Sequence, residues 1–295
     1  MTYNRLTRTH QHKLEVQELP YKMTSLCREA LKWPSGRRVG LNRTRRSNYI
    51  VIVRFVLFPF LALLMTMMTL IDAPLVILTA LLGQQTVAYQ LVRCWCWVLN
   101  LLGGVRYTVR GVENLPGKGS YVIVSNHCSH YDGPTLILAL PHDFYFVIKR
   151  ELTRVPLWGQ AVVKLGYIAI DRGHSEKAKE QMTAAAQIVR AGRRVMVFAE
   201  GTRSCQETML PFKKGAFHLA IDAGVPILPV AINNSRSILP KGALLPKPGT
   251  IECVIGAPIS TENLSKEDVP ILLEQTRQSI IAMRSSCRAE LMARP

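Results

Sequence analysis

Two long apolar stretches near the N-terminus constrain the fold of this chain more than any other feature of its sequence. They run over residues 48–71 and 75–102, and the Asp72-Ala73-Pro74 segment between them is typical of a turn. As a helix of about 22 residues, the first stretch would be about 33 Å long, which is enough to cross the hydrocarbon core of a bilayer. We therefore predict a hydrophobic, membrane-associated helical hairpin over residues 48–102. The alternative is a pair of buried core helices.

Several residues interrupt or mark these apolar stretches. Pro59 lies inside the first stretch, where a proline predicts a kink. Gly83-Gln84-Gln85 and Arg93 interrupt the second stretch. Trp95 and Trp97 lie near its end, and tryptophan suits the interface between membrane and water. We therefore expect a hairpin that spans the bilayer or half-enters one leaflet.

The chain is strongly basic. Its 295 residues include 37 Lys and Arg against 20 Asp and Glu, for a net charge of +17, and 48% of them are hydrophobic. Residues 1–47 are polar and basic without a periodic apolar face, which predicts a flexible cationic arm. A basic surface attracts nucleic acid, anionic lipid headgroups or a phosphorylated substrate. The apolar stretches favour lipid among these partners.

Strands and helices alternate in the remainder of the chain, residues 103–295, after a boundary at Gly103-Gly104. Apolar runs and period-two patterns predict seven strands, at 105–109, 121–125, 144–148, 167–170, 194–198, 227–232 and 251–255. Helices are predicted at 134–140, 155–164, 176–191, 215–223 and 268–291. This alternation predicts an α/β domain with a mixed, mainly parallel sheet flanked by helices.

The segment after the second predicted strand places a histidine and a carboxylate on one short loop. Residues 125–132, Ser-Asn-His-Cys-Ser-His-Tyr-Asp, lead into a helix with Pro134 at its first position and Asp132 near its N-cap. His127 and Asp132 are five positions apart, which is too wide for one helix face but suits the two ends of a tight loop. Asp132 could then orient the His127 ring while the other ring nitrogen takes a proton from a substrate, as in acyl transfer. The alternative is a surface turn with a satisfied cap.

Cys128 lies inside the same loop and has to be considered as a nucleophile. The seven cysteines are scattered, and Cys94-Trp95-Cys96 is the one close pair, with no second pair to complete a zinc site. Buried thiols in a reduced compartment are the simpler interpretation.

Two further predicted strand ends carry cationic side chains. In open α/β sheets, ligands usually bind outside the carboxyl ends of the strands. The Glu200-Gly201-Thr202-Arg203 segment leaves a strand through a glycine that permits a sharp turn, and its arginine offers a planar fork for a phosphate. Lys149 and Arg150 follow another strand. Alone, each segment is equally an ordinary loop or a solvated face.

Taken together, these segments resemble the PlsC-like glycerolipid acyltransferases, also called lysophosphatidate acyltransferases. The resemblance covers roughly residues 104–260, and a hydrophobic hairpin also precedes the domain in family members. The resemblance rests on four motifs in order. The first is an Asn-His-x-Ser-x-x-Asp block at Asn126, His127, Ser129 and Asp132, and the second is a Lys/Pro and Gly-x-Ile-x-x-Asp-Arg block at Lys149, Pro156, Gly166, Ile168, Asp171 and Arg172. The third is a Pro-Glu-Gly-Thr-Arg-Ser block at residues 199–204, and the fourth is a strand containing Pro229. Ala199 replaces the usual proline, and Cys128 stands where the family often has glutamine.

The resemblance implies roles for particular residues. His127 would deprotonate the hydroxyl of a lysophospholipid while Asp132 holds the ring, and the hydroxyl would attack an acyl thioester directly. The implied substrate-binding residues are Lys149, Glu200, Gly201, Thr202 and Arg203. Arg203 would hold the acceptor phosphate, Glu200 would orient its loop, and Lys149 would face either the phosphate or the developing oxyanion.

The resemblance also implies the reaction and its partners. The enzyme would be a 1-acylglycerol-3-phosphate O-acyltransferase at the cytoplasmic side of a membrane, with acyl-CoA or acyl-ACP as co-substrate, no bound cofactor and no metal. Its partners would be a lysophospholipid, the acyl thioester and membrane lipids, but no nucleic acid. One alternative is a relative acting on another lysolipid. Another is a non-catalytic basic module that binds a membrane surface or nucleic acid, which would not need the His127/Asp132 pair.

Overall fold

The computed structural model describes residues 43–117, 119–171, 173, 175–204 and 208–292. Residues 1–42 of the predicted cationic arm, and Arg172, lie outside the described residues. The first described helix, α2, begins at Arg43. Residues 50–295 form one compact unit, which contains both the apolar hairpin and the α/β domain.

The core of this unit is a seven-stranded sheet in the order β1-β7-β6-β2-β5-β3-β4. Its strands are β1 Val105–Arg110, β2 Val122–Ser125, β3 Tyr145–Lys149, β4 Ile168–Ile170, β5 Val195–Phe198, β6 Ile227–Asn233 and β7 Gly249–Ile255. Every neighbouring pair is parallel except β6 with β7. All seven predicted strands and the mixed, mainly parallel sheet are confirmed.

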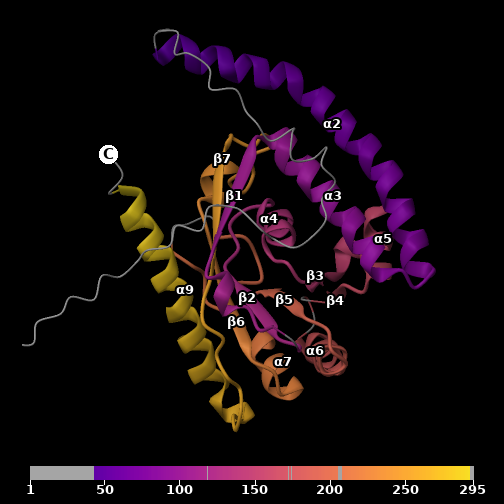
Figure 1. Cartoon of the computed structure of the whole chain (residues 1–295), viewed down its shortest axis with the longest axis vertical. Helices are drawn as coiled ribbons and strands as arrows, with labels where there is room; N and C mark the ends of the chain where they lie inside the picture. Colours follow the sequence, from indigo (N-terminus) through magenta and orange to yellow (C-terminus); the bar gives the residue numbers. More distant parts are fainter. Residues whose placement is uncertain (1–42, 118, 172, 174, 205–207, 293–295) are drawn as a thin grey trace, which may run out of the picture. The chain divides into compact units, whose positions relative to one another are not determined.

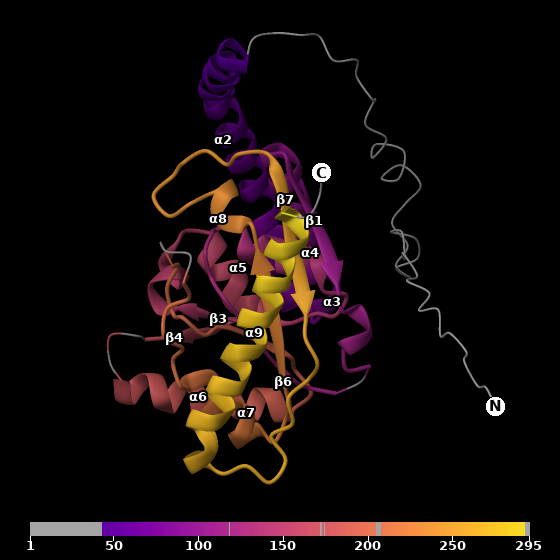
Figure 2. The same ribbon diagram turned by 90° about the vertical axis from the view of Figure 1, so that its left-hand side faces the viewer.

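Helices cover both faces of the sheet. They are α3 Gln85–Gly103, α4 Asp132–Ala139, α5 Trp158–Leu165, α6 Ser175–Arg190, α7 Gly215–Ala223, α8 Ser235–Ile238 and α9 Val269–Met292, with short 3₁₀ turns η1 Val112–Asn114, η2 Arg150–Arg154 and η3 Lys266–Asp268. Figures 1 and 2 show α9 on the opposite side of the sheet from α3 and α4.

Adjacent residues of the central strand β2 belong to different cores. Ile123 packs with the cluster that includes α3, α4 and α5, whereas Val122 and Val124 pack with the cluster that includes α6, α7 and α9. Successive strand side chains point to opposite faces, so a sheet covered on both sides needs the continuous apolar run found here. The sheet is therefore the middle of three layers.

The hairpin forms, but its turn is not where the sequence predicted it. Helix α2 runs from Arg43 to Leu81, so the predicted turn at residues 72–74 is wrong. Pro59 and Pro74 both lie inside this helix. The chain turns instead at Gly83, whose φ of +73° is accessible to glycine without strain. A proline removes one backbone donor, whereas a left-handed glycine ends the helical path altogether.

The two helices of the hairpin differ in their surroundings. Within the described residues, the segment Pro59–Leu81 is long and apolar enough to cross a membrane, and 11% of an 18-residue window in it is buried. Helix α3 instead packs against the domain, and its buried residues are Ala88, Tyr89, Cys96 and Asn100. A hydrogen bond of 3.0 Å from Trp95 Nε1 to Thr69 Oγ1 links α3 to α2.

Candidate active site

The loop after β2, residues 125–132, is held to the neighbouring strand by Asn126. The Asn126 side chain donates to the carbonyl of Ile232 (2.9 Å) and accepts from the Ile232 N–H (2.8 Å). Ile232 lies near the carboxyl end of β6, which pairs in parallel with β2. These two hydrogen bonds fix the start of the loop. We call the whole loop, residues 125–132, the His–Asp turn. The sequence motif includes Asn126 but did not predict this structural role.

The predicted contact between His127 and Asp132 is present. His127 Nδ1 lies 2.9 Å from Asp132 Oδ2, and the same oxygen accepts the N–H groups of Cys128 (2.6 Å) and Ser129 (2.8 Å). An ionised carboxylate can only accept hydrogen bonds, so Nδ1 carries the hydrogen and Nε2 remains to take a proton.

Burial separates the two members of this pair. The Asp132 side chain is 0% exposed, whereas that of His127 is 20% exposed. Asp132 is also the first residue of α4, where the helix dipole favours a negative charge. The sequence placed this helix two residues later, with Asp132 at the cap and Pro134 at the first helical position, and that detail is wrong. The pair therefore consists of a fully buried carboxylate in contact with a partly solvent-accessible imidazole.

The ring of His127 is held by a further contact that the sequence gave no sign of. It stacks on Phe198 with ring centroids 4.0 Å apart and an interplanar angle of 12°. Phe198 is the last residue of β5, and its partner in the parallel register is Ser125 at the end of β2. Aromatic stacking at this distance restricts rotation of the imidazole.

Glu200 contacts the His–Asp turn, and each of its carboxylate oxygens accepts a hydrogen bond. Oε1 accepts the N–H of His127 at 2.7 Å, and Oε2 accepts the N–H of Leu210 at 2.8 Å. The side chain is buried, which raises its pKa, and the two backbone donors act in the opposite direction. In addition, the N–H of Ser204 donates to the His127 carbonyl at 2.8 Å. These bonds join the two predicted loops into one structure.

Gly201 and Arg203 follow on the same loop. Gly201 has a φ of +70°, and a Cβ at this position would lie 2.9 Å from Cε of Lys213. Thr202 is exposed and Arg203 is partly exposed. The pKa of His130 is lowered first by burial and then by the positive charge of Arg203. Arg203 is three positions after Glu200, whose carboxylate accepts the N–H of His127.

Lys149 ends β3 at the same carboxyl edge of the sheet. Its Nζ lies 2.9 Å from Glu151 Oε1, and both side chains are about half exposed (51% and 53%). Arg150 lies 3.7 Å from Asp171. An exposed ion pair contributes little to stability, so the lysine can exchange its partner for an anionic ligand.

Cys128 is buried, and burial raises the pKa of its thiol to about 11. The negative charge of Asp132 contributes to this rise in the pKa of the thiol. Because the thiolate is the nucleophilic form, this environment argues against a nucleophilic role. Among the described residues, no group of three or more His, Cys, Asp and Glu side chains is placed to ligate a metal.

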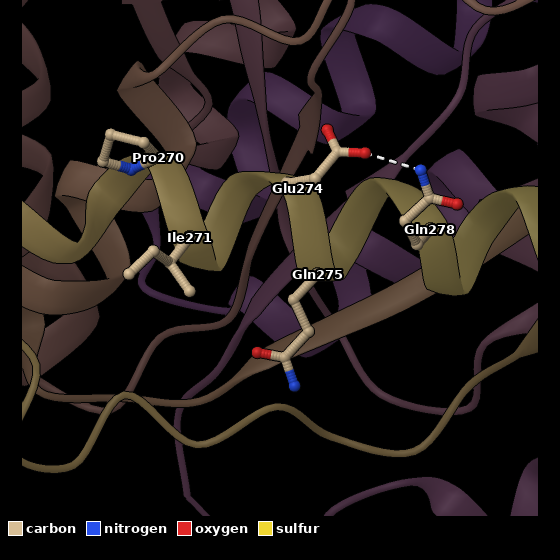
Figure 3. Close-up of a pocket in the computed structure, with 5 residues that line it drawn as sticks. All are labelled: Pro270, Ile271, Glu274, Gln275 and Gln278. Atoms are coloured by element: carbon tan, nitrogen blue, oxygen red, sulfur yellow. Dashed lines mark hydrogen bonds between the residues drawn. The ribbon is translucent and has the colours of Figure 1, made fainter.

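A shallow hollow elsewhere on the surface does not include these residues. It lies along α9 and is lined by Pro270, Ile271, Glu274, Gln275 and Gln278 (Figure 3). All five side chains come from one helix, and Gln278 donates to Glu274 at 2.5 Å within it. The hollow contains no histidine paired with a carboxylate, so the His–Asp turn remains the candidate active site.

Comparison with known proteins places this site in a family. An acyltransferase family model matches residues 106–233, which include the His–Asp turn, Lys149 and Glu200 to Arg203. The chain is 35% identical to the human 1-acyl-sn-glycerol-3-phosphate acyltransferase alpha over 205 residues, covering 69% of this chain and 72% of the human protein. It is 35% identical to the Pseudomonas aeruginosa 1-acyl-sn-glycerol-3-phosphate acyltransferase over 206 residues, or 68% and 77% of the two chains.

The mouse alpha protein is 38% identical over 184 residues, and the match covers 65% of its length. A solved structure, the 1-acyl-sn-glycerophosphate acyltransferase PlsC from Thermotoga maritima, superposes with a TM-score of 0.67 at 23% identity, covering 82% of this chain and 99% of that one. The fold is that of this solved acyltransferase, and the matching family model is an acyltransferase model. The chain belongs to the 1-acyl-sn-glycerol-3-phosphate acyltransferase family. The predicted resemblance is confirmed.

Proposed function

We propose that this protein transfers a fatty acyl group from an acyl thioester to the free hydroxyl of 1-acyl-sn-glycerol-3-phosphate, giving phosphatidic acid. The observation that carries the proposal is the His127–Asp132 contact of 2.9 Å, with a buried carboxylate behind an accessible ring. The family of the chain supports the choice of substrate class.

The proposed reaction uses His127 as a general base. Its Nε2 takes the proton of the acceptor hydroxyl as the oxygen attacks the thioester carbonyl carbon. The carbon–oxygen bond forms, the carbon–sulfur bond breaks, and the thiol leaves with the proton that His127 returns. Asp132 stabilises the imidazolium that forms in between. No acyl-enzyme is required, which agrees with the protonated Cys128 thiol.

The proposed acceptor site is the cationic edge beside this base. Arg203 binds the phosphate of the acceptor through its planar fork, with the Gly201 backbone and the Thr202 hydroxyl next to it. Lys149 supplies a second positive charge for the phosphate or for the developing oxyanion. Glu200 acts as a positioning residue, because both of its oxygens are already bound to backbone N–H groups.

The remaining partners follow from the reaction. The donor is acyl-CoA or acyl-ACP, with no bound cofactor or metal, and the protein takes no nucleic-acid partner. The exposed apolar side of α2 lies in membrane lipid, and the basic N-terminal sequence favours the cytoplasmic side for the active site. Alkaline carbonate extraction tests the membrane association. The protein should stay with the membrane pellet, and full release into the supernatant would contradict it.

The proposed activity is tested by offering purified protein a panel of lysolipids with an acyl thioester and following thiol release. We expect release with 1-acyl-sn-glycerol-3-phosphate and formation of phosphatidic acid in equal amount. A clear preference for another lysolipid would assign a different acceptor within the same family. No release with any acceptor would overturn the proposed function.

A further inference from the structure

Arg93 of α3 is bound to the end of a helix that it does not belong to. Its guanidinium donates to the carbonyls of Ile137 (2.7 Å), Leu140 (2.9 Å) and Leu138 (3.2 Å). These three carbonyls lie at the C-terminal end of α4, 44 to 47 positions away in the sequence. The guanidinium of the arginine that interrupts an apolar stretch therefore caps a helix of the α/β domain.

Helix α4 depends on an external cap of this kind. The last carbonyls of any helix have no partner within the helix, and a cation near them also complements the helix dipole. Helix α4 has no basic residue in its own last turn, and it is only eight residues long. Its C-cap N–H, from Leu140, satisfies Leu136 alone. Arg93 satisfies three more carbonyls with one rigid, planar group.

The N-terminal end of α4 also contacts α3. Tyr131, the N-cap residue of α4, donates from its hydroxyl to the carbonyl of Leu99 at 3.4 Å. The approach is close at Gly103, where a Cβ would lie 2.2 Å from the Tyr131 hydroxyl oxygen. Helix α3 thus contacts α4 at both ends, so the position of α4 along its axis is set from outside.

We propose that Arg93 is a positioning residue for acyl transfer, which acts through α4 on Asp132. Asp132 is the first residue of α4, and its Oδ2 holds both the His127 ring and the turn backbone. A shift of α4 toward its C-terminal end would draw the carboxylate away from Nδ1 of His127. This inference rests on the proposed function and names a residue outside the matched family segment.

The test compares Arg93→Met, Arg93→Lys and a control, Arg106→Met. Arg106 is an exposed arginine on β1, so its replacement removes one positive charge at a solvent-exposed position outside α4. A misplacement of about 1 Å in the reacting groups can cost about a hundredfold in rate, so Arg93→Met should lower kcat by about ten- to a hundredfold with little change in either KM. Arg93→Lys keeps the charge but loses the fork, and should fall between Arg93→Met and wild type. Arg106→Met should match wild type.

A double-mutant cycle separates positioning from a merely structural role. Residues that act as one unit show strongly non-additive effects, so in an Asp132→Asn background Arg93→Met should lower kcat by less than about twofold. Activity is expressed per folded molecule, measured by circular dichroism. An equal fold-loss in both backgrounds, or wild-type kcat in folded Arg93→Met, would overturn the inference. If Arg93→Met does not fold, wild-type kcat in folded Arg93→Lys overturns it.

The two proposals fail in different ways. Absence of acyl transfer in the wild-type protein would remove the proposed function and this inference with it. An active wild-type protein with unchanged kcat in the Arg93 variants would remove only the positioning role.

Discussion

The His–Asp turn and the cationic side chains beside it are built in opposite ways. Asp132 is fully enclosed and accepts three hydrogen bonds on one oxygen, and Glu200 below it is bound through both oxygens. Lys149, by contrast, is half exposed and paired with an equally exposed Glu151. Proton transfer requires a fixed geometry, whereas a long charged side chain can follow a mobile lipid headgroup. Damage to the turn should therefore lower kcat, and damage to the cations should raise KM.

The largest effect is expected from Asp132→Asn. An amide has the size of the carboxylate but cannot accept three hydrogen bonds on one ionised oxygen, so the His127 ring loses its orientation and its countercharge. We expect kcat to fall by about 10²- to 10⁴-fold, the usual contribution of general acid–base catalysis, with the acceptor KM little changed. Steady-state kinetics on folded protein provide the measurement. A KM effect without a kcat effect would reverse the division of roles between the two regions.

A smaller effect is expected from Arg203→Lys. The substitution keeps the charge but loses the planar fork, and one hydrogen bond to a charged group is worth about 1.5–3 kcal/mol. That loss corresponds to roughly a ten- to hundredfold rise in the acceptor KM. The donor KM should not change, which is tested by varying each substrate in turn. Equal losses for donor and acceptor, or loss of folded protein, would remove Arg203 from the acceptor site.

The smallest effect is expected from Cys128→Ser, although this residue lies inside the enclosed region. Burial raises the pKa of the thiol to about 11, so it stays protonated and unreactive near neutral pH. The variant should keep most of the activity. In the wild type, alkylation of Cys128 should be slow at pH 7 and accelerate as the pH rises toward 11. Capture of an acyl group on Cys128 in a quenched reaction, seen by mass spectrometry, would contradict direct attack.

The sequence was sufficient for the sheet and for the contact between His127 and Asp132. The central strands are short apolar runs buried on both faces, such as Val122–Ser125, and their pattern depends on local residues alone. The His127–Asp132 contact was also predictable, because both residues lie on one short loop. The end of α2 was not predictable from Pro74, because the helix continues through this proline to Leu81. The left-handed Gly83 follows that end and turns the chain.

The supports of the turn could not be predicted, because their partners are distant in the sequence. Asn126 binds Ile232, 106 positions away, and His127 stacks on Phe198 from another strand. Arg93 gave a signal, as a lone charge in an apolar stretch, but its partners are backbone carbonyls that every residue possesses. Such contacts follow from packing and leave no pattern of residue types.

The most direct test of this account is acyl transfer by His127→Ala, with Cys128→Ser as the neighbouring control. Both proteins are purified, checked for folding, and given 1-acyl-sn-glycerol-3-phosphate and an acyl thioester while thiol release is followed. General-base catalysis predicts a loss of about 10²- to 10⁴-fold for His127→Ala and near wild-type release for Cys128→Ser. Turnover near wild type in a folded His127→Ala protein would contradict the mechanism.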